Sequence, residues 1–331
     1  MRFFGSWEIV HSIPQKRRPT QSCFVCGGSF SGKRLTGLKA EGKYYEVVFC
    51  QGCGLGKTEP FLEESELKKL YSSTYRKEDS TRFPAPLEWL IGIVRDGRRR
   101  AVEKYARKGR ILDIGCGRGD FLLMMLRRGW ECFGLELDER VSSFNRPGLE
   151  LRYGSLSDSS FPDGYFDAVT FWHVFEHVRD PEWTLKECAR ILKPGGLLLV
   201  AVPNTASLQS MTTGSAWFHL DPPFHLYHYS AGNMKRLLEK NGFEVKSRRH
   251  FSFEYNPYGF LQSFYNAMGL KQNLLYEYLR SRSARSVKTR AGLAFMFATL
   301  PFVAVLSTVF SAVEALLRAG GTIEVYARKK G

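Results

Sequence analysis

Cysteine and acidic residues are both scarce in this chain of 331 residues. Its seven cysteines are too few for a disulfide-based scaffold of that length. The 33 Asp and Glu residues are outnumbered by 48 Lys and Arg, and the net charge of +15 favours an anionic surface, RNA or an anionic substrate as partner. The N-terminal segment lacks the long uncharged apolar run of a signal peptide, so we expect a cytoplasmic protein with reduced thiols.

Apolar residues, in contrast, are abundant. They make up 44% of the chain, which is enough for a large core and excludes disorder as the main state. Between residues 109 and 252, short apolar segments alternate with amphipathic helical ones, a pattern typical of a parallel sheet with helical crossovers. Strands are predicted at residues 44–49, 110–115, 131–136, 166–171, 197–202, 243–248 and 322–327.

The chain divides into six predicted parts. They are a basic N-terminal arm (1–20), a cysteine-containing module (21–60), a helical linker or lid (61–108), an α/β core (109–253), a helical insertion (254–320) and a last strand with a basic tail (321–331). Within the linker, the run from Arg95 to Arg110 has the spacing of an amphipathic helix whose cations mostly form a solvated face.

Four of the cysteines are paired by their spacing. Cys23 and Cys26, and then Cys50 and Cys53, form two Cys-x2-Cys-Gly knuckles. Such knuckles present four thiolates tetrahedrally, because the glycine lets backbone amides turn toward the sulfur atoms. We therefore predict a structural zinc site, whose binding typically contributes about 10–16 kcal/mol to the folding of a small module. Four unrelated buried cysteines are the alternative.

A glycine loop follows the first strand of the α/β core. The apolar segment that contains Asp113 leads into Gly115-x-Gly117-x-Gly119. Such loops let a backbone approach a ligand closely, but they occur in many folds. Asp113 narrows the choice, because an anion there would disfavour the pyrophosphate of a dinucleotide and suits the amino group or sulfonium of S-adenosylmethionine. Glu136, at the end of the next strand, is suitably placed for a ribose diol.

Residues 109–252 therefore resemble a class I S-adenosylmethionine-dependent methyltransferase. Two further segments carry the resemblance, one from Phe161 to Val169 before the fourth strand and one from Leu192 to Gly196 before the fifth. The resemblance implies a Rossmann-like α/β fold with seven strands in the order 3-2-1-4-5-7-6, strand 7 being antiparallel. It also implies that Asp113 and the glycine loop hold the methionine part of the cofactor, while Glu136 holds the ribose.

One position departs from the family. The acid that often follows the glycine at the end of strand 3 is Ser155 here, so adenine binding would rely on Ser155 and the backbone of Leu156. The cofactor-binding residues that the resemblance implies are Asp113, Gly115, Cys116, Gly117, Gly119, Glu136, Leu137, Ser155, Leu156 and Trp172. The cysteine module is similar to the zinc ribbons fused to many bacterial methyltransferases, several of which act on nucleotide sugars, lipid-linked glycans or small hydroxylated metabolites.

Histidines after the fourth strand are catalytic candidates. His173, Glu176 and His177 are spaced i, i+3, i+4, so a helix there would place them on one face, at the edge where open α/β sheets bind ligands. Three interpretations remain open. His177 could be a general base, with His173 nearer the cofactor. The trio could help bind a divalent cation, as the similar Glu-x-x-Glu-His of ubiquinone-pathway O-methyltransferases suggests, or it could only stabilise the loop. The same residues also match the His-x-x-Glu-His motif of inverted zinc proteases. We reject that interpretation, because the residues lie where the methyltransferase sheet has the loop after its fourth strand.

A second histidine cluster follows the fifth strand. His225 and His228 are expected in a loop that leads into a helix capped by Ser230. In the related enzymes this loop covers the acceptor pocket, which makes His225 the third catalytic candidate. Loop histidines that only bond the backbone are the alternative.

The insertion contains a long uncharged stretch. Residues 291–313 carry no charged side chain and meet the length rule for a membrane-spanning helix, and a purely basic run from Arg280 to Arg290 precedes them. The strands on either side should be neighbours in one sheet, which excludes a single crossing and favours a monotopic or re-entrant hairpin at anionic headgroups. A helix buried against the sheet or in a homodimer interface is the alternative.

Together these features predict an O-methyltransferase that acts on a lipidic or lipid-linked acceptor at the cytoplasmic face of the inner membrane, with S-adenosylmethionine and zinc as cofactors. A soluble sugar or small metabolite is the second acceptor class. RNA is the third, and nucleic acid is not an expected partner, because no RNA-binding module stands out. A membrane-associated zinc-ribbon binding module with a lapsed catalytic domain is the non-enzymatic alternative, which intact Asp113 and Glu136 argue against.

Overall fold

The computed structural model describes residues 22–40, 42–63, 65–67, 70, 96–138, 146–252, 255–281 and 287–331. The predicted N-terminal arm and most of the predicted linker lie outside these ranges.

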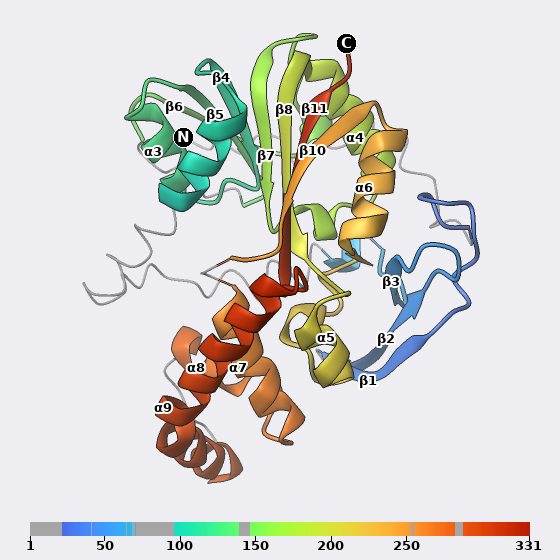
Figure 1. Ribbon diagram of the computed structural model, residues 1–331, viewed down its shortest axis with the longest axis vertical. Coiled ribbons are helices and arrows are strands. Elements are labelled where there is room, and N and C mark those ends of the chain that lie inside the picture. Colours follow the sequence, from blue (N-terminus) through green and yellow to red (C-terminus); the bar gives the residue numbers. More distant parts are fainter. Residues whose placement is uncertain are drawn as a thin grey trace, which may run out of the picture.

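A seven-stranded sheet forms the centre of the described structure (Figure 1). In spatial order its strands are β6 (Leu149–Tyr153), β5 (Glu131–Glu136), β4 (Arg110–Ile114), β7 (Phe166–Trp172), β8 (Leu192–Pro203), β11 (Thr322–Lys329) and β10 (Phe243–Arg249). The strands from β6 to β8 are parallel, whereas β11 is antiparallel to both of its neighbours. Numbered along the core, the order is 3-2-1-4-5-7-6, so the predicted Rossmann-like topology is confirmed.

Helices cover the two faces of this sheet because successive strand residues point to opposite sides. Ile111 packs with the helical residues 96–105 and with α3 (Asp120–Leu126) on one face. Leu112, one residue later, packs on the other face with α4 (Pro181–Ile191) and α6 (Ala231–Lys240). The Ser230 side chain caps α6 by accepting from the backbone N–H of Asn233, as the sequence predicts.

A second, smaller sheet combines the cysteine module with the core. Its strands are β1 (Arg34–Ala40), β2 (Lys43–Phe49), β3 (Gly56–Glu59) and β9 (Tyr227–His228), in that order. The first three strands come from the module, but β9 belongs to the segment that follows β8. His228 therefore lies in a short strand and not in the loop that we expected. A Cβ atom at Gly56 would lie 2.9 Å from the Cβ of His228, so only glycine allows this close pairing.

The connection between β8 and β9 contains three short helices: α5 (Leu208–Thr213), η4 (Gly214–Ala216) and η5 (Phe218–Leu220). Two further short turns lie at the carboxyl edge of the main sheet: η2 (Leu156–Asp158) and η3 (Phe175–His177). η2 follows β6 and η3 follows β7, and η3 carries two of the candidate residues, Glu176 and His177.

The insertion forms a bundle that projects from one end of the sheet (Figure 1). Its helices are α7 (Asn256–Ala267), α8 (Leu274–Ser281) and α9 (Val287–Leu316). They have an apolar cluster of their own, distinct from the two clusters that flank the sheet. Because β10 and β11 pair directly, from Phe243 opposite Lys329 to Arg249 opposite Glu324, the chain leaves and re-enters the sheet at the same edge.

Candidate active site

The glycine loop turns sharply between β4 and α3. Gly115, Gly117 and Gly119 have φ values of 75°, 53° and 73°, in the left-handed region that other residues rarely adopt. A Cβ atom at Gly115 would lie 2.2 Å from a methyl carbon of Val174, which excludes any side chain there. Backbone alone therefore lines this turn, as the sequence pattern indicates.

Two carboxylates flank the loop on adjacent strands. Asp113 is buried at the end of β4 and accepts a 2.6 Å hydrogen bond from the Thr170 hydroxyl. Burial raises the pKa of Asp113 to about 7. Glu136, at the end of β5, accepts from the backbone N–H groups of Gly117 at 2.8 Å and Leu137 at 2.7 Å. One acid is thus enclosed beneath the loop, and the other fixes the loop's conformation.

The end of β6 has an acid that its sequence position did not suggest. The hydroxyl and the backbone N–H of Ser155 both donate to Asp158 Oδ2, at 2.6 Å and 2.8 Å. Leu156 is buried at the start of η2. Asp158 is therefore an additional candidate for the acid that is missing after Gly154, and the Ser-x-x-Asp capping pattern is the signal that could have located it.

Arg98 brings a cation to this edge from the helical residues 96–105. Its guanidinium lies 4.9 Å from the ring centroid of Trp172, at the end of β7, and donates to the Tyr255 hydroxyl at 3.3 Å. Its charge also acts to lower the pKa of Asp113, against the larger effect of burial. Most cations of this basic run are exposed, as expected, including Arg100, Lys104, Arg107 and Lys108. The exceptions include Arg98, which is half-buried at this edge, and Arg99, which is buried and paired with Asp96 at 2.7 Å and with Glu103.

His173 stands apart from the other histidines. It has φ = 57°, and its ring packs against Tyr255 with centroids 3.8 Å apart. Its Nδ1 lies 3.6 Å from Oε1 of Glu176. The turn that follows is the 3₁₀ helix η3 and not an α-helix, so the predicted helical face shared by His173, Glu176 and His177 does not form.

Glu176, His177 and His225 form a compact polar cluster. Glu176 is 1% exposed, and neither of its buried carboxylate oxygens has a hydrogen-bond partner among the described residues. One ligand atom from each of the three side chains lies within 4.8 Å of the others. Burial raises the pKa of Glu176, lowers that of His177, and lowers that of His225 to about 4. At neutral pH both imidazoles are therefore uncharged.

Backbone carbonyls orient the two imidazole rings. Nδ1 of His177 lies 2.8 Å from the carbonyl oxygen of Phe224, and Nδ1 of His225 lies 2.9 Å from that of His219. A carbonyl oxygen can only accept, so each Nδ1 carries the proton and each Nε2 carries the lone pair. Both histidines are thus held as acceptors or ligands through Nε2.

The four cysteines of the module meet at one point. Sγ of Cys23 is 3.5 Å from that of Cys53, Sγ of Cys26 is 3.4 Å from that of Cys50, and all four lie within 4.8 Å of one another. The two knuckle glycines, Gly27 and Gly54, have φ values of 77° and 70°, in the left-handed region that favours glycine. A Cβ atom at Gly52, inside the second knuckle, would lie 2.9 Å from the Cys26 sulfur, so glycine lets the backbone approach the thiols there as well. The other three cysteines are buried: Cys132 and Cys188 in the core and Cys116 at the glycine loop.

The part of the chain that forms the main sheet is similar in sequence to known proteins. A family model described as a methyltransferase domain matches residues 87–248. A ubiquinone biosynthesis O-methyltransferase of Xanthomonas oryzae pv. oryzae is 35% identical over 178 residues, which cover 51% of this chain and 74% of that protein. This chain belongs to the S-adenosylmethionine-dependent methyltransferases.

Two further comparisons accompany this assignment. A "probable S-adenosylmethionine-dependent methyltransferase" of Mycolicibacterium smegmatis is 33% identical over 142 residues, which cover 41% of this chain and 52% of that protein. The chain thus spans about half the length of that relative. A solved methyltransferase from Archaeoglobus fulgidus is 22% identical with a TM-score of 0.46, over 79% of this chain and 99% of its own.

The methyltransferase fold places the predicted cofactor residues along one edge. Asp113, the glycine loop, Glu136 and Trp172 all lie at the carboxyl ends of β4, β5 and β7, where open α/β sheets bind their ligands. The left-handed glycines and the two carboxylates fit S-adenosylmethionine, which carries a sulfonium, an amino group and a ribose. Each individual role remains a prediction, as do those of Leu137, Ser155 and Leu156. Arg98, Tyr255 and Asp158 are the additional candidates.

Proposed function

We propose that this methyltransferase methylates a hydroxyl group of a lipidic or lipid-linked acceptor at the cytoplasmic face of a membrane. The observation that carries the proposal is the position of Tyr255, which precedes the first helix of the insertion. Its ring packs on His173 and its hydroxyl bonds Arg98. The insertion therefore begins at the candidate site and continues away from it as an apolar bundle.

One face of α9 supports a lipid environment. Leu293, Met296 and Val303 belong to the apolar cluster inside the bundle, whereas other apolar side chains of the same helix are exposed. Among the most exposed are Phe302, Val305, Val309 and Leu316, at 68%, 64%, 55% and 84%. Residues 290–316 are long and apolar enough to cross a membrane by length and composition. An exposed apolar surface of this kind is typical of an interaction site. A membrane interface would cover it and would also attract the net positive charge of the chain.

The topology of the insertion bears on how it would meet a membrane. Both of its ends join paired strands of one sheet, so a single crossing would separate β10 from β11. A bundle that lies in the interface or enters and returns keeps the sheet intact. The relative named for ubiquinone biosynthesis also favours a lipidic acceptor with a hydroxyl group.

The chemistry follows from the residues at the edge of the sheet. S-adenosylmethionine, when bound, supplies an electrophilic methyl group. The Asp113 carboxylate attracts a cationic ligand, and the loop glycines leave room for it. Nε2 of His177 would accept the proton that the acceptor hydroxyl loses when it is methylated. Glu176 stabilises the imidazolium that results, because its carboxylate lies in the same cluster.

The same cluster fits a divalent cation. Glu176 offers two buried oxygens without hydrogen-bond partners among the described residues, and His177 and His225 offer Nε2 atoms that carbonyl oxygens orient from behind. A cation held there would lower the pKa of a bound hydroxyl, and His177 would then be a ligand. Activity after chelation with EDTA, with and without added Mg²⁺ or Mn²⁺, separates this role from that of a metal-free base.

We also propose that Cys23, Cys26, Cys50 and Cys53 hold one structural zinc ion. The four sulfur atoms have the spacing and the donor chemistry that zinc prefers. Four cysteine ligands would leave the zinc ion no open position for a substrate. The ion would therefore stabilise the fold of β1, β2 and β3.

The acceptor class is tested with methyl-labelled S-adenosylmethionine, the purified full chain and a total cell extract. The products are then separated into organic, aqueous and RNA fractions. Label in the organic fraction supports the proposal. Label confined to the aqueous or RNA fraction assigns a soluble metabolite or RNA as acceptor and overturns it. Absence of S-adenosylmethionine binding would favour the non-enzymatic alternative.

A further inference from the structure

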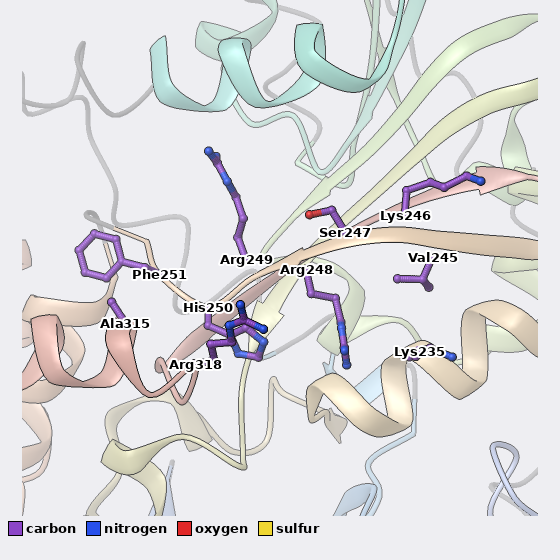
Figure 2. Close-up of a pocket in the computed structure, with 10 residues that line it drawn as sticks. All are labelled: Lys235, Val245, Lys246, Ser247, Arg248, Arg249, His250, Phe251, Ala315 and Arg318. Carbon is purple, nitrogen blue, oxygen red and sulfur yellow. The ribbon is translucent and has the colours of Figure 1, made fainter.

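A basic cavity lies at the root of the insertion, away from the candidate active site. Its volume is about 760 Å³, and it is lined by α6, by β10 with the residues that follow it, and by the end of α9. Among its ten lining residues are five Lys or Arg side chains and one histidine, and none of the ten is acidic (Figure 2).

Two of these cations carry no compensating charge. Lys235 is paired with Glu239 at 2.6 Å, Lys246 with Glu244 at 2.5 Å, and Arg249 points to the other side of β10 (Figure 2). Within the described part of the chain, Arg248 and Arg318 have no carboxylate within 4.0 Å. Both side chains are exposed to the cavity, so an anion could reach them without displacing an internal partner.

His250 also lines the cavity, and in Figure 2 its ring overlaps the end of Arg318. Its Nδ1 is buried and has no hydrogen-bond partner among the described residues. Burial, with smaller contributions from the charges of Arg248 and Arg318, lowers the pKa of His250. The ring is therefore a neutral hydrogen-bonding group beside two cations. Phosphate oxygens accept from such a set, and guanidinium groups match their geometry.

The end of α9 brings Arg318 to this position. Arg318 has φ = 52° just after the helix, where glycine is the usual residue. A Cβ atom at Gly320 would lie 1.5 Å from the carbonyl oxygen of His250, so the turn after α9 packs directly on the end of β10. The cations of the cavity therefore come together only because both ends of the insertion meet here.

The cavity borders the end of α9, whose exposed apolar side chains begin next to it in the chain. Phe251 and Ala315 line it, and Leu316 and Leu317, next along the chain, are 84% and 65% exposed. A free phosphate ion would contact only the cations of the cavity. A phospholipid would contact the cations through its headgroup and the exposed apolar side chains of α9 through its acyl chains.

We propose that this cavity binds the phosphate group of an anionic membrane lipid, with Arg248 and Arg318 as the phosphate ligands and the exposed face of α9 as the acyl-chain contact. The inference deepens the proposed membrane attachment and rests on it. It adds a defined headgroup site to what would otherwise be diffuse attraction between a basic protein and a negative surface.

Vesicle co-sedimentation of the full chain tests the proposal. One set of vesicles is pure phosphatidylcholine, and the other contains phosphatidylglycerol as well. We compare wild type, Arg248→Gln/Arg318→Gln and the control Arg127→Gln/Lys186→Gln, which removes the same charge from exposed positions on α3 and α4. Diffuse attraction predicts an equal loss in both variants, roughly fivefold per cation near the surface. A headgroup site predicts that the cavity variant loses at least tenfold more affinity for the anionic vesicles than the control does.

The remaining outcomes separate the two proposals. If wild type binds both kinds of vesicle and the two variants behave alike, the membrane attachment stands and the headgroup site is wrong. If wild type binds neither kind, both proposals fail. Competition by millimolar inorganic phosphate would reassign the cavity to a soluble phosphate, and a loss of RNA affinity without a loss of vesicle affinity would reassign it to nucleic acid. Thermal denaturation of each variant confirms that the exposed substitutions leave the fold intact.

Discussion

The rings of Tyr255 and His173 lie 3.8 Å apart, one at the start of the insertion and the other at the end of β7. This contact joins the helical insertion to the carboxyl edge of the main sheet, where the candidate active site lies. His173 adopts a left-handed conformation, which is uncommon for a residue with a side chain and recurs at functional sites.

Tyr255→Ala should lower turnover of the acceptor without weakening cofactor binding. The ring contact with His173 and the 3.3 Å bond from Arg98 are both lost, and contacts of this kind contribute about 0.5–1.5 kcal/mol each. We expect kcat/KM to fall by roughly tenfold, and Tyr255→Phe to lose less because the ring remains. Steady-state kinetics and calorimetric titration with S-adenosylmethionine measure the two effects. An equal loss in both variants would assign the whole effect to the hydroxyl.

Cofactor affinity should depend on pH through Asp113. Its pKa is raised to about 7, so the carboxylate gains a proton as the pH falls through that value and no longer attracts a cation. Affinity for S-adenosylmethionine should then fall by up to about tenfold per pH unit below about 7. Titration calorimetry from about pH 5.5 to about pH 8.5 covers the transition.

Two variants serve as controls for that profile. Asp113→Asn should bind weakly at every pH, because its side chain never carries the charge. Arg98→Gln should move the midpoint to higher pH, since the Arg98 charge acts to lower the pKa of Asp113. A wild-type profile that is flat across the range would contradict the assignment.

Acid should destabilise the fold through buried histidines. Burial lowers the pKa of His219 to about 3, of His225 to about 4 and of His228 to about 3, whereas an unfolded chain binds the same protons near pH 6.5. The unfolded state therefore holds more protons between these values, and stability is lost as the pH falls from about 6.5 toward about 4. Each histidine contributes up to about 1.4 kcal/mol per pH unit.

Urea unfolding at several pH values measures that slope. The comparison is with His225→Gln and His228→Gln, each of which should make the slope shallower while lowering stability at neutral pH, because Thr58 bonds both segments. Zinc content has to be measured in parallel, since acid also protonates thiolates. An unchanged slope in both variants would mean that other groups control the acid transition.

Cys26→Ser should remove zinc and also reduce catalysis. The midpoint of thermal unfolding should fall by about 10 °C or more, because a four-cysteine site contributes much of the stability of its module. Catalysis should fall as well, because β3 pairs with β9 and Thr58 donates to the carbonyl of His225 at 2.6 Å. Metal analysis and labelled methyl transfer measure the two losses. Cys188→Ser, in the sheet core, should leave the zinc content unchanged.

Replacing residues 256–317 with a short turn should leave a folded domain that still binds S-adenosylmethionine. The bundle has its own apolar cluster, and β10 and β11 already pair as neighbours. We expect the shortened chain to lose vesicle binding and to dissolve without detergent. Loss of cofactor binding together with unfolding would show that the bundle is part of the core. A shift from dimer to monomer in size-exclusion chromatography would instead show that α9 covers a second copy.

The sheet and the glycine loop could be predicted because their signals are local. Alternating apolar segments fix which residues face each side, and the positive φ values at Gly115, Gly117 and Gly119 require glycine. The pairing of β3 with β9 could not be predicted, because β9 has only two residues and its partner lies far away in the sequence. Local patterns contain no information on such a contact.

The site was predicted less completely than the fold. His177 and His225 both lie beside Glu176, and their catalytic roles stay predictions. The helix expected at residues 173–177 is a 3₁₀ turn, and His173 packs on Tyr255. The position of Arg98 could not be predicted, because an amphipathic pattern shows which side of a helix is polar and not which cation meets a functional edge. Trp172 and Asp113, its partners there, come from other segments.

The four-stranded sheet that β9 completes has a consequence for how this protein can change. A segment that supplies three strands and takes its fourth from the catalytic domain cannot be exchanged as an independent cassette. Residues 22–60 grafted onto another methyltransferase would have an unpaired strand edge at β3. This chain without those residues would lose the hydrogen bond from Thr58 to the carbonyl of His225. We therefore expect a chimera to remain functional only when the cysteine module and residues 219–229 are transferred together.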